Sequence, residues 1–298
     1  MDSIPYYPGC TLNTVAKDFD LSARDAFRLL GVELAELAKW NCCGSSFPLT
    51  PNNAIALTGP TNVLVQSQKE GGTVSTLCSF CYSTLKRTNE AVKEDKEDKK
   101  NLINNFLGTD YDGSVKVVHL LEVLRDDVGY PELKKHVKRD LKKIKVAAYY
   151  GCTLLRPKGV AIDNPERPQI FEDFLQAIGC QPIEFSHKGE CCGSHLAMSR
   201  EDIVVKLSGK VIDAALAGGA EMITTTCPLC FYNLERSQKH TQESTGEGST
   251  LPMVYFTQLL GLALGMPVED LDLPKNFSDP RSLLAAKGIV EEAVSVGA

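Results

Sequence analysis

The chain lacks long apolar stretches, an export signal and an excess of positive charge. Its longest apolar run, Leu259 to Met266, is far shorter than the roughly 20 residues of a membrane helix. The segment Met1 to Pro5 has neither a basic region nor the apolar region of an export signal. A formal net charge of −6 argues against nucleic acid as a partner. We therefore expect a soluble, cytoplasmic protein in which thiols stay reduced.

Two common cofactor motifs are also missing. The sequence contains no C-x-x-C-x-x-C-x-x-x-C-P run, which would hold cubane iron–sulfur clusters, and no G-x-G-x-x-G fingerprint for a flavin or dinucleotide. The length of the chain is not a limitation: at 298 residues it can bury a core as one large domain or two medium ones.

Cysteine, by contrast, is abundant and strongly patterned. Ten of the eleven cysteines form two sets of five, each made of a lone cysteine, an adjacent pair and a C-x-x-C motif. From the second member of the pair to the C-x-x-C motif the gap is 35 residues in both sets (43 to 78 and 192 to 227). Dense cysteines in a reducing compartment indicate metal ligands or redox groups rather than disulfides. The first set is Cys10, Cys42, Cys43, Cys78 and Cys81; the second is Cys152, Cys191, Cys192, Cys227 and Cys230.

The text around the cysteines repeats as well. Tyr6 to Leu12 reappears as Tyr149 to Leu154, and each adjacent pair is followed by Gly-Ser. The repetition predicts two copies of one supersecondary unit. We place the first repeat at residues 1–143 and the second, with a C-terminal arm, at residues 144–298.

Within each copy the pattern alternates between strands and helices. Lys145 to Tyr150 and Glu221 to Thr226 are β-prone runs that end at a cysteine turn, whereas Asp20 to Leu30 has apolar residues at helical spacing and ends before Gly31. Pro228 suits the first turn of a helix that continues through Leu234. This alternation favours an α/β fold, here two pseudo-symmetric repeats with the cysteines in loops at strand ends.

Five thiolates exceed what one tetrahedral zinc ion binds, and also exceed the four that a cubane cluster needs. Adjacent cysteines point apart, so they suit an object several ångströms wide. An iron–sulfur cluster larger or more open than a cubane is therefore our first interpretation. Zinc in one half, disulfides and free thiols are the alternatives. Cys180 occupies an apolar position of the repeat and is interpreted as a buried core thiol.

These motifs resemble the CCG family of cysteine-rich domain proteins, and within it the B subunits of heterodisulfide reductase, in which the motif occurs twice. The resemblance covers about Tyr6 to Lys239 and includes Val117 to Leu124 and Ile162 to Pro168. It implies two non-cubane 4Fe–4S clusters, each held by one five-cysteine set, that cleave a disulfide. The adjacent pairs Cys42–Cys43 and Cys191–Cys192 would be the catalytic residues.

The resemblance also implies partners and a substrate class. The family's A chain, with FAD and iron–sulfur centres, and its C chain, with cubane 4Fe–4S clusters, would supply the electrons that this chain has no motif to carry. The substrate would be the coenzyme M–coenzyme B heterodisulfide or a related disulfide or sulfur compound. The alternative is an electron-transfer subunit of a membrane-associated or flavin dehydrogenase complex.

Several side chains near the second set are candidates for supporting roles. Proton donors could be His187, Lys188 or His195, but nearness in the sequence is the only argument, and a position on the surface or behind the ligands is the simpler explanation of each. Basic residues could hold an anionic substrate. They are Arg156, Lys158, Arg167 and Arg200.

Overall fold

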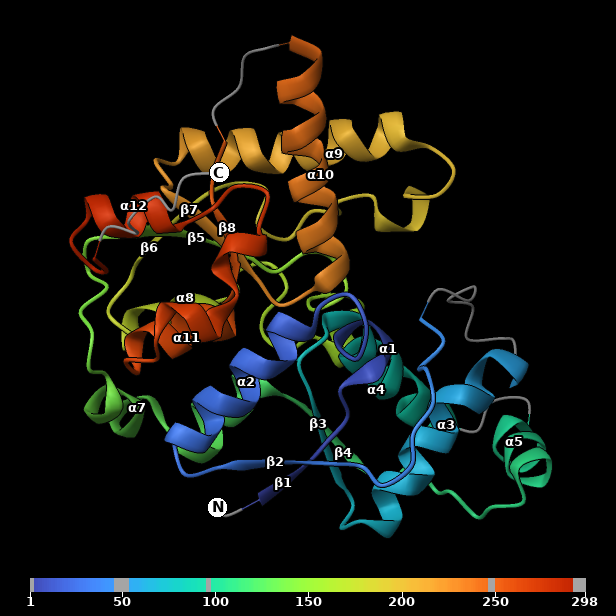
Figure 1. The fold of residues 1–298 in the computed structure, drawn as a ribbon. Helices are drawn as coiled ribbons and strands as arrows, with labels where there is room; N and C mark the ends of the chain where they lie inside the picture. Colours follow the sequence, from blue (N-terminus) through green and yellow to red (C-terminus); the bar gives the residue numbers. More distant parts are fainter. Residues whose placement is uncertain (1–2, 46–53, 95–97, 246–249, 292–298) are drawn as a thin grey trace.

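The computed structural model of the protein describes residues 3–45, 54–94, 98–245 and 250–291. Its strands form two parallel sheets of four strands with the same order, β2-β1-β3-β4 and β6-β5-β7-β8 (Figure 1). This confirms the predicted α/β architecture of two pseudo-symmetric repeats. The first sheet contains β1 (Ser3–Tyr6), β2 (Glu33–Glu36), β3 (Thr73–Thr76) and β4 (Lys116–His119). The second contains β5 (Lys145–Tyr149), β6 (Gln181–Ile183), β7 (Met222–Thr225) and β8 (Met253–Tyr255).

Helices connect and cover the strands of both sheets. Those associated with the first sheet are α1 (Gly9–Leu12), α2 (Lys17–Leu29), α3 (Ala54–Lys69), α4 (Ser79–Glu94), α5 (Lys99–Leu107), α6 (Leu120–Glu122), the π-helix η2 (Val123–Val128) and α7 (Tyr130–His136). Those associated with the second are η3 (Lys158–Val160), α8 (Ile170–Ala177), η4 (Ser194–Leu196), α9 (Glu201–Ala217), α10 (Pro228–Thr245), α11 (Phe256–Ala263), η5 (Val268–Leu271), η6 (Leu273–Lys275) and α12 (Arg281–Ala286).

The elements expected from the sequence are present, with small shifts at their ends. The two β-prone runs correspond to β5 and β7, and the apolar pattern from Asp20 corresponds to α2. The helix expected from Pro228 to Leu234 is longer and continues to Thr245. Helix ends shift easily because only the apolar face is fixed by packing, so the polar last turns of α10 carry little signal.

The two repeats share one core because helices of each repeat pack against helices of the other. Helix α11, which follows the last strand of the second sheet, packs on α2 of the first repeat, and α6 with η2 packs on α8 of the second. Tyr255 stacks on Phe19 with ring centroids 4.1 Å apart. The Ser22 and Thr257 hydroxyls, both fully buried, lie 2.7 Å apart across the same contact. The repeats therefore bury apolar surface against each other.

The described part of the C-terminal arm folds back onto its own repeat, and its first segment, η5, also packs on α2 of the first repeat. Leu271, Leu273 and Leu284 are buried, and the Asn276 side chain donates a hydrogen bond to the carbonyl of Met253 at 2.6 Å. The arm thus covers the outer strand of the second sheet. Residues 292–298 lie outside the described residues.

Candidate functional site

All ten cysteines of the two sets lie beyond the carboxyl ends of strands. The lone cysteines follow β1 and β5, and the C-x-x-C motifs follow β3 and β7. In each sheet these two strands are neighbours at the point where the strand order reverses. Open parallel sheets form a crevice at this point, where ligands bind. The adjacent pairs arrive from the loops after β2 and β6.

In the first set the sulfur atoms contact one another as a chain. Cys10 Sγ lies 3.5 Å from Cys42 Sγ, and Cys43 Sγ lies 3.4 Å from Cys81 Sγ. Cys78 interacts with Cys81 through its side chain. The fold therefore brings together all five cysteines that the sequence grouped, although they span 72 residues (10 to 81, counted inclusively).

The second set has the same arrangement. Cys192 Sγ lies 3.5 Å from Cys230 Sγ, which matches the Cys43–Cys81 contact of the first set. Cys152 interacts with Cys191, and the main-chain N–H of Cys230 donates to Cys227 Sγ at 3.4 Å. All eleven cysteines of the chain are free thiols.

The two cysteines of each adjacent pair differ in exposure, although the side chains of Cys42 and Cys43 still hydrogen-bond to each other. Cys42 is exposed and contacts the exposed Cys10, whereas Cys43 is buried and contacts the buried Cys81. In the second set Cys191 is half-buried and Cys192 is buried. Each pair thus links a more exposed and a more buried part of its set.

Main-chain groups approach the sulfurs closely at two glycines. A Cβ atom added to Gly9 would lie 3.0 Å from Cys81 Sγ, and one added to Gly151 would lie 3.1 Å from Cys230 Sγ. Both glycines have positive φ angles, +76° and +66°. The glycine after each pair also donates its N–H to a sulfur, from Gly44 to Cys42 at 3.4 Å and from Gly193 to Cys191 at 3.3 Å. Such amides stabilise a negative charge on sulfur.

The thiols of each set strongly influence one another's pKa. The Cys152 thiol hydrogen-bonds to Cys191 and lowers the pKa of Cys191 to about 5, helped by the Gly193 N–H and the neighbouring His195. The pKa of Cys192 is lowered, first by its hydrogen bond with Cys230. In the first set, hydrogen bonds from Cys42 and Cys81 hold the pKa of Cys43 well below its ordinary value. The same hydrogen bonds raise the pKa of the partner thiols, which are Cys42, Cys81, Cys152 and Cys230. Each contact therefore favours thiolate, the form that binds metals, on one sulfur of a pair while its partner keeps the proton.

Three further residues that the sequence interpretation missed contact these sites. Tyr7 and Tyr149 are fully buried, and burial followed by the nearby cysteines raises the pKa of both hydroxyls. Both therefore stay protonated. The Asn233 side chain donates to Cys192 Sγ at 3.6 Å from α10. Tyr7 and Tyr149 belong to the sequence segment that is repeated around the lone cysteines, and this repetition could have identified them.

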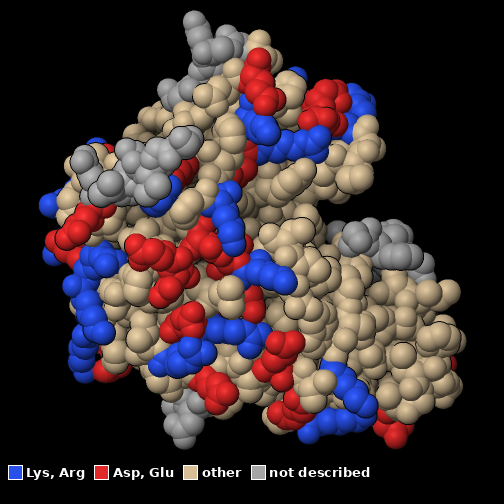
Figure 2. All heavy atoms as spheres, viewed as in Figure 1, with Lys and Arg blue, Asp and Glu red and all other residues tan. Residues whose placement is uncertain are grey.

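The two sets adjoin each other. The hydroxyls of Ser79 and Thr226, which are next to Cys78 and Cys227 in sequence, lie 2.5 Å apart and are fully buried. The pKa of Cys227 is raised by burial and then by the charge of Cys78. Figure 2 shows a hollow lined by uncharged residues between the region of α1, which carries Cys10, and the loop of η4.

Most of the basic candidates near the second set are already engaged. Lys188 Nζ forms an ion pair with the buried Glu172 at 2.8 Å. Arg156 donates to the carbonyl of Gly189 at 3.0 Å, and Arg200 pairs with Asp202 at 2.8 Å.

The remaining candidates differ in their relation to the sulfurs. His195 lies beside Cys191, as its effect on that thiol's pKa shows, whereas His187 Nδ1 lies 2.8 Å from the Ser186 hydroxyl. Lys158 and Arg167 are exposed on the surface. Cys180 is buried in the core, where burial raises its pKa to about 12, which confirms its interpretation as a core thiol.

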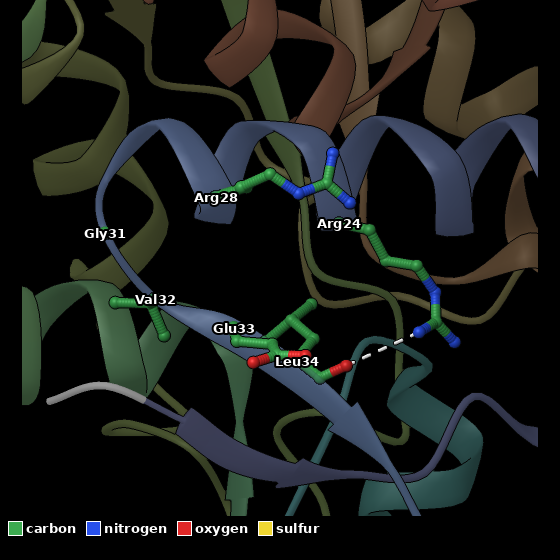
Figure 3. Close-up of a pocket in the computed structure, with 6 residues that line it drawn as sticks. All are labelled: Arg24, Arg28, Gly31, Val32, Glu33 and Leu34. Atoms are coloured by element: carbon green, nitrogen blue, oxygen red, sulfur yellow. Dashed lines mark hydrogen bonds between the residues drawn. The ribbon is translucent and has the colours of Figure 1, made fainter.

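A pocket elsewhere in the molecule contains none of the ten cysteines. It lies at the turn between α2 and β2, where Arg24 donates to the carbonyl of Leu34 at 3.4 Å (Figure 3). Asp20 and Glu36 already accept hydrogen bonds from the same guanidinium, at 2.8 and 2.6 Å. The charge of Arg24 is therefore neutralised within the chain.

The thiol sets fit an iron–sulfur cluster better than a single ion. Within the described residues, no three Cys, His, Asp or Glu side chains are arranged around one point as a mononuclear metal would require. Each set instead brings five cysteine side chains together through successive contacts. Thiolates are soft ligands suited to iron–sulfur chemistry, and the space beside Gly9 and Gly151 is kept free of a Cβ atom.

Comparisons with known proteins agree with this chemistry. The chain is 32% identical to the 8-methylmenaquinol:fumarate reductase membrane anchor subunit of Wolinella succinogenes, over 93% of this chain and 98% of the relative. It is 28% identical to the B subunit of the ferredoxin/F(420)H(2)-dependent CoB-CoM heterodisulfide reductase of Methanosarcina acetivorans, over 93% and 94% of the two chains. None of the helices in the described part of this chain has the length and apolarity to cross a bilayer.

A solved structure and a family model complete the comparison. A crystal structure of a hypothetical protein from Helicobacter pylori has a similar fold, with a TM-score of 0.73 at 13% identity, over 93% of this chain and 52% of that one. The model of the cysteine-rich domain named CCG matches residues 4–86 and again residues 146–235. Because these matches take in more than half of the sequence and each includes one five-cysteine set, the chain belongs to the CCG family of cysteine-rich domain proteins.

Proposed function

We propose that the protein is an iron–sulfur oxidoreductase subunit that reductively cleaves a disulfide within a multi-subunit cytoplasmic complex. The observation that carries this proposal is the pair of complete five-thiol sets that adjoin across the Ser79–Thr226 contact. Each set would hold one non-cubane 4Fe–4S cluster through all five of its sulfurs. The relative named as the B subunit of a CoB-CoM heterodisulfide reductase supports the same reaction class.

The reaction takes up two electrons and two protons and converts one disulfide into two thiols. When bound, the iron–sulfur clusters supply the electrons one at a time. The chain itself contributes binding and proton delivery. The uncharged hollow between the α1 region and the η4 loop is where we expect the substrate to enter. His195, beside Cys191, is the group we expect to protonate one product thiolate.

The electrons come from partner chains in this proposal, because the sequence has neither a cubane motif nor a flavin fingerprint. By the family resemblance these partners are the FAD-containing A chain and the cubane-containing C chain of a heterodisulfide reductase. The coenzyme M–coenzyme B heterodisulfide is the first substrate to test, followed by related disulfides and sulfur compounds.

The test compares two cysteines that differ in their surroundings. The complex, reduced and supplied with disulfide under anaerobic conditions, should release two thiols per disulfide. Changing Cys191 to Ala should abolish this, because Cys191 is a member of the second set. Changing Cys180 to Ala, a core thiol outside both sets, should leave thiol release intact. Equal activity of Cys191→Ala and wild type would refute the assignment.

A second function is favoured by the relative named as a fumarate reductase membrane anchor subunit. In that case the chain would pass electrons between a quinol and a flavin-containing partner and would not act on disulfides. Co-purification separates the two, because the first function predicts the A and C chains of a heterodisulfide reductase and the second predicts a flavin-containing fumarate reductase. Failure of any disulfide to reoxidise the reduced complex, with rapid reoxidation by fumarate, would support this second function.

A further inference from the structure

Each repeat contains a buried tyrosine that ties the lone cysteine's strand to the loop of the adjacent pair. The Tyr7 hydroxyl donates to the carbonyl of Asn41 at 2.9 Å, and the Tyr149 hydroxyl donates to the carbonyl of Glu190 at 2.8 Å. Both acceptors are the residue immediately before the first cysteine of a pair. Both tyrosines stand three residues before the lone cysteine. The contact is therefore duplicated at equivalent positions.

The tyrosine rings also lie against the glycine turns at which the main chain meets sulfur. A Cβ atom added to Gly9 would lie 3.5 Å from the Tyr7 ring and 3.0 Å from Cys81 Sγ. One added to Gly151 would lie 3.9 Å from the Tyr149 hydroxyl and 3.1 Å from Cys230 Sγ. Ring, glycine and sulfur thus form one packed layer in each repeat.

The surroundings of the two tyrosines have otherwise diverged. Trp40 packs edge-on against Tyr7, with ring centroids 5.6 Å apart, whereas the corresponding position of the second repeat is Gly189. There the loop is held by the hydrogen bond from Arg156 to the Gly189 carbonyl, at 3.0 Å. A hydrogen bond that recurs among different neighbours points to a requirement of the site itself rather than of general core packing.

We propose that Tyr7 and Tyr149 are positioning residues of the two sites: each hydroxyl fixes the distance between a lone cysteine and its adjacent pair. The proposal rests on the proposed function, in which each set holds an iron–sulfur cluster. Cys10 lies in α1, just after β1, whereas Cys42 and Cys43 stand on a loop that continues past the end of β2. The hydrogen bond from Tyr7 holds this loop against the end of β1. In the second repeat, the hydrogen bond from Tyr149 holds the loop that carries Cys191 against the end of β5. Groups that orient metal ligands in this way commonly alter metal affinity about 10- to 100-fold.

Each of the two tyrosines has a second tyrosine next to it in the sequence, which provides a matched control. Tyr6 is next to Tyr7, is equally buried, and donates its hydroxyl to Asp20 at 2.6 Å. Tyr150 is next to Tyr149, is equally buried, and hydrogen-bonds with Glu172. Tyr7→Phe, Tyr149→Phe and Tyr6→Phe each remove one hydroxyl and the hydrogen bond that it donates. Tyr150→Phe removes two hydrogen bonds, because this hydroxyl also accepts from the N–H of Phe171 at 2.9 Å. Only Tyr7→Phe and Tyr149→Phe remove a hydrogen bond to the residue before an adjacent pair.

The experiment measures iron and acid-labile sulfide, the rate of iron release to a chelator, and the EPR spectrum of the reduced protein. We expect Tyr7→Phe and Tyr149→Phe each to release iron about tenfold faster from one of the two sites and to shift one EPR component each. Tyr6→Phe and Tyr150→Phe should lower thermal stability but leave the EPR components of wild type. If one of the two variants does not fold, the other still tests the proposal, because Tyr7 and Tyr149 belong to different sites.

The outcomes separate this inference from the proposed function. One outcome is that wild type binds iron while Tyr7→Phe and Tyr149→Phe give the same EPR spectra and iron release rates as the controls Tyr6→Phe and Tyr150→Phe. In that case the positioning role is wrong and the proposed function stands. If wild type prepared anaerobically binds no iron and no sulfide, the proposed function fails and this inference fails with it.

Discussion

At the scale of single residues, Gly9 leaves the least room for a side chain beside a sulfur atom among the described glycines. We predict that Gly9→Ala removes most of the iron from the first site, because the added Cβ would stand 3.0 Å from Cys81 Sγ. Gly31 is the matched control: its φ of +74° equals the +76° of Gly9, but nothing lies within 4 Å of an added Cβ. Gly31→Ala should therefore cost only the backbone strain, about 1–2 kcal/mol. Iron and labile sulfide per chain, with urea unfolding, measure both effects.

The comparison has a clear opposite outcome. If Gly9→Ala and Gly31→Ala keep the same iron content and lose the same stability, then the turn at Gly9 has room for a methyl group. In that case the glycine would serve only the positive φ angle, and the close packing of Gly9 against Cys81 would not matter for the site.

A buried histidine provides a prediction about pH. His119 is fully buried, its Nδ1 accepts from the N–H of Leu121 at 3.1 Å, and its Nε2 lies 2.7 Å from the carbonyl of Leu77. Burial lowers the pKa of His119 to about 4, against about 6.5 in an unfolded chain. Between these values the unfolded chain binds more protons at this residue, so the contribution of His119 to the free energy of unfolding should rise by roughly 3 kcal/mol as the pH rises from 4 to 6.5.

Urea unfolding of wild type and His119→Asn from pH 4.5 to 7.5 checks this prediction, since the variant should lack the rise. Glu235 is a useful control of opposite sign. Burial raises the pKa of Glu235 to about 7, so the folded chain binds the extra proton and stability should fall between pH 4.5 and 7. Glu235→Gln should remove that fall. Parallel profiles for wild type and His119→Asn would contradict the histidine prediction.

The cysteine sets could be predicted from the sequence, whereas most of their supporting residues could not. Cysteine is rare, and the identical gap of 35 residues in two copies carries the signal. Tyr7 and Tyr149 are hydrogen-bonded to main-chain carbonyls 34 and 41 residues away, which no side-chain pattern reveals. A buried tyrosine in a strand is normally interpreted as core, so only its place in the repeat marks it.

At the scale of elements, Ser79 at the start of α4 and Thr226 in the turn between β7 and α10 join the two repeats. Their hydroxyls are fully buried and 2.5 Å apart, so removing either leaves the other without that partner. We predict that Ser79→Ala and Thr226→Val each lower the free energy of unfolding by about 1–3 kcal/mol. The double variant should lose less than the sum, with a coupling energy of about 1 kcal/mol.

Thr88 of α4 serves as the control for this cycle. It is almost fully buried, but its hydroxyl has no hydrogen-bond partner among the described residues. Thr88→Val should therefore leave stability nearly unchanged or raise it. Strict additivity of Ser79→Ala and Thr226→Val would mean that this contact does not join the repeats.

The elements themselves followed well from local patterns, but their pairing between repeats did not. The run ending at Tyr149 is β-prone and uninterrupted, as expected for a strand covered on both faces. The exchange of α11 onto α2 depends on contacts such as Tyr255 with Phe19, more than 200 residues apart in the sequence. Both helices have an apolar face, and an apolar face does not identify the surface that covers it.

At the scale of the whole molecule, the exchanged helices imply that the two repeats unfold together. The single tryptophan, Trp40, lies in the first repeat and packs on Tyr7, so its fluorescence reports on that half. Far-UV circular dichroism reports on both halves. Ile223 is fully buried in β7 of the second sheet, and Ile223→Val should lower the free energy of unfolding by about 1 kcal/mol.

If the shared core makes one cooperative unit, this substitution in the second repeat should shift the Trp40 transition by the same urea concentration as the circular dichroism transition. Leu102→Ala, at an exposed position of α5, should shift neither. A Trp40 transition that stays at the wild-type midpoint, while circular dichroism shows an earlier step, would mean that the repeats unfold separately. The Ser79–Thr226 joint would then have to hold the two thiol sets together without the support of a common core.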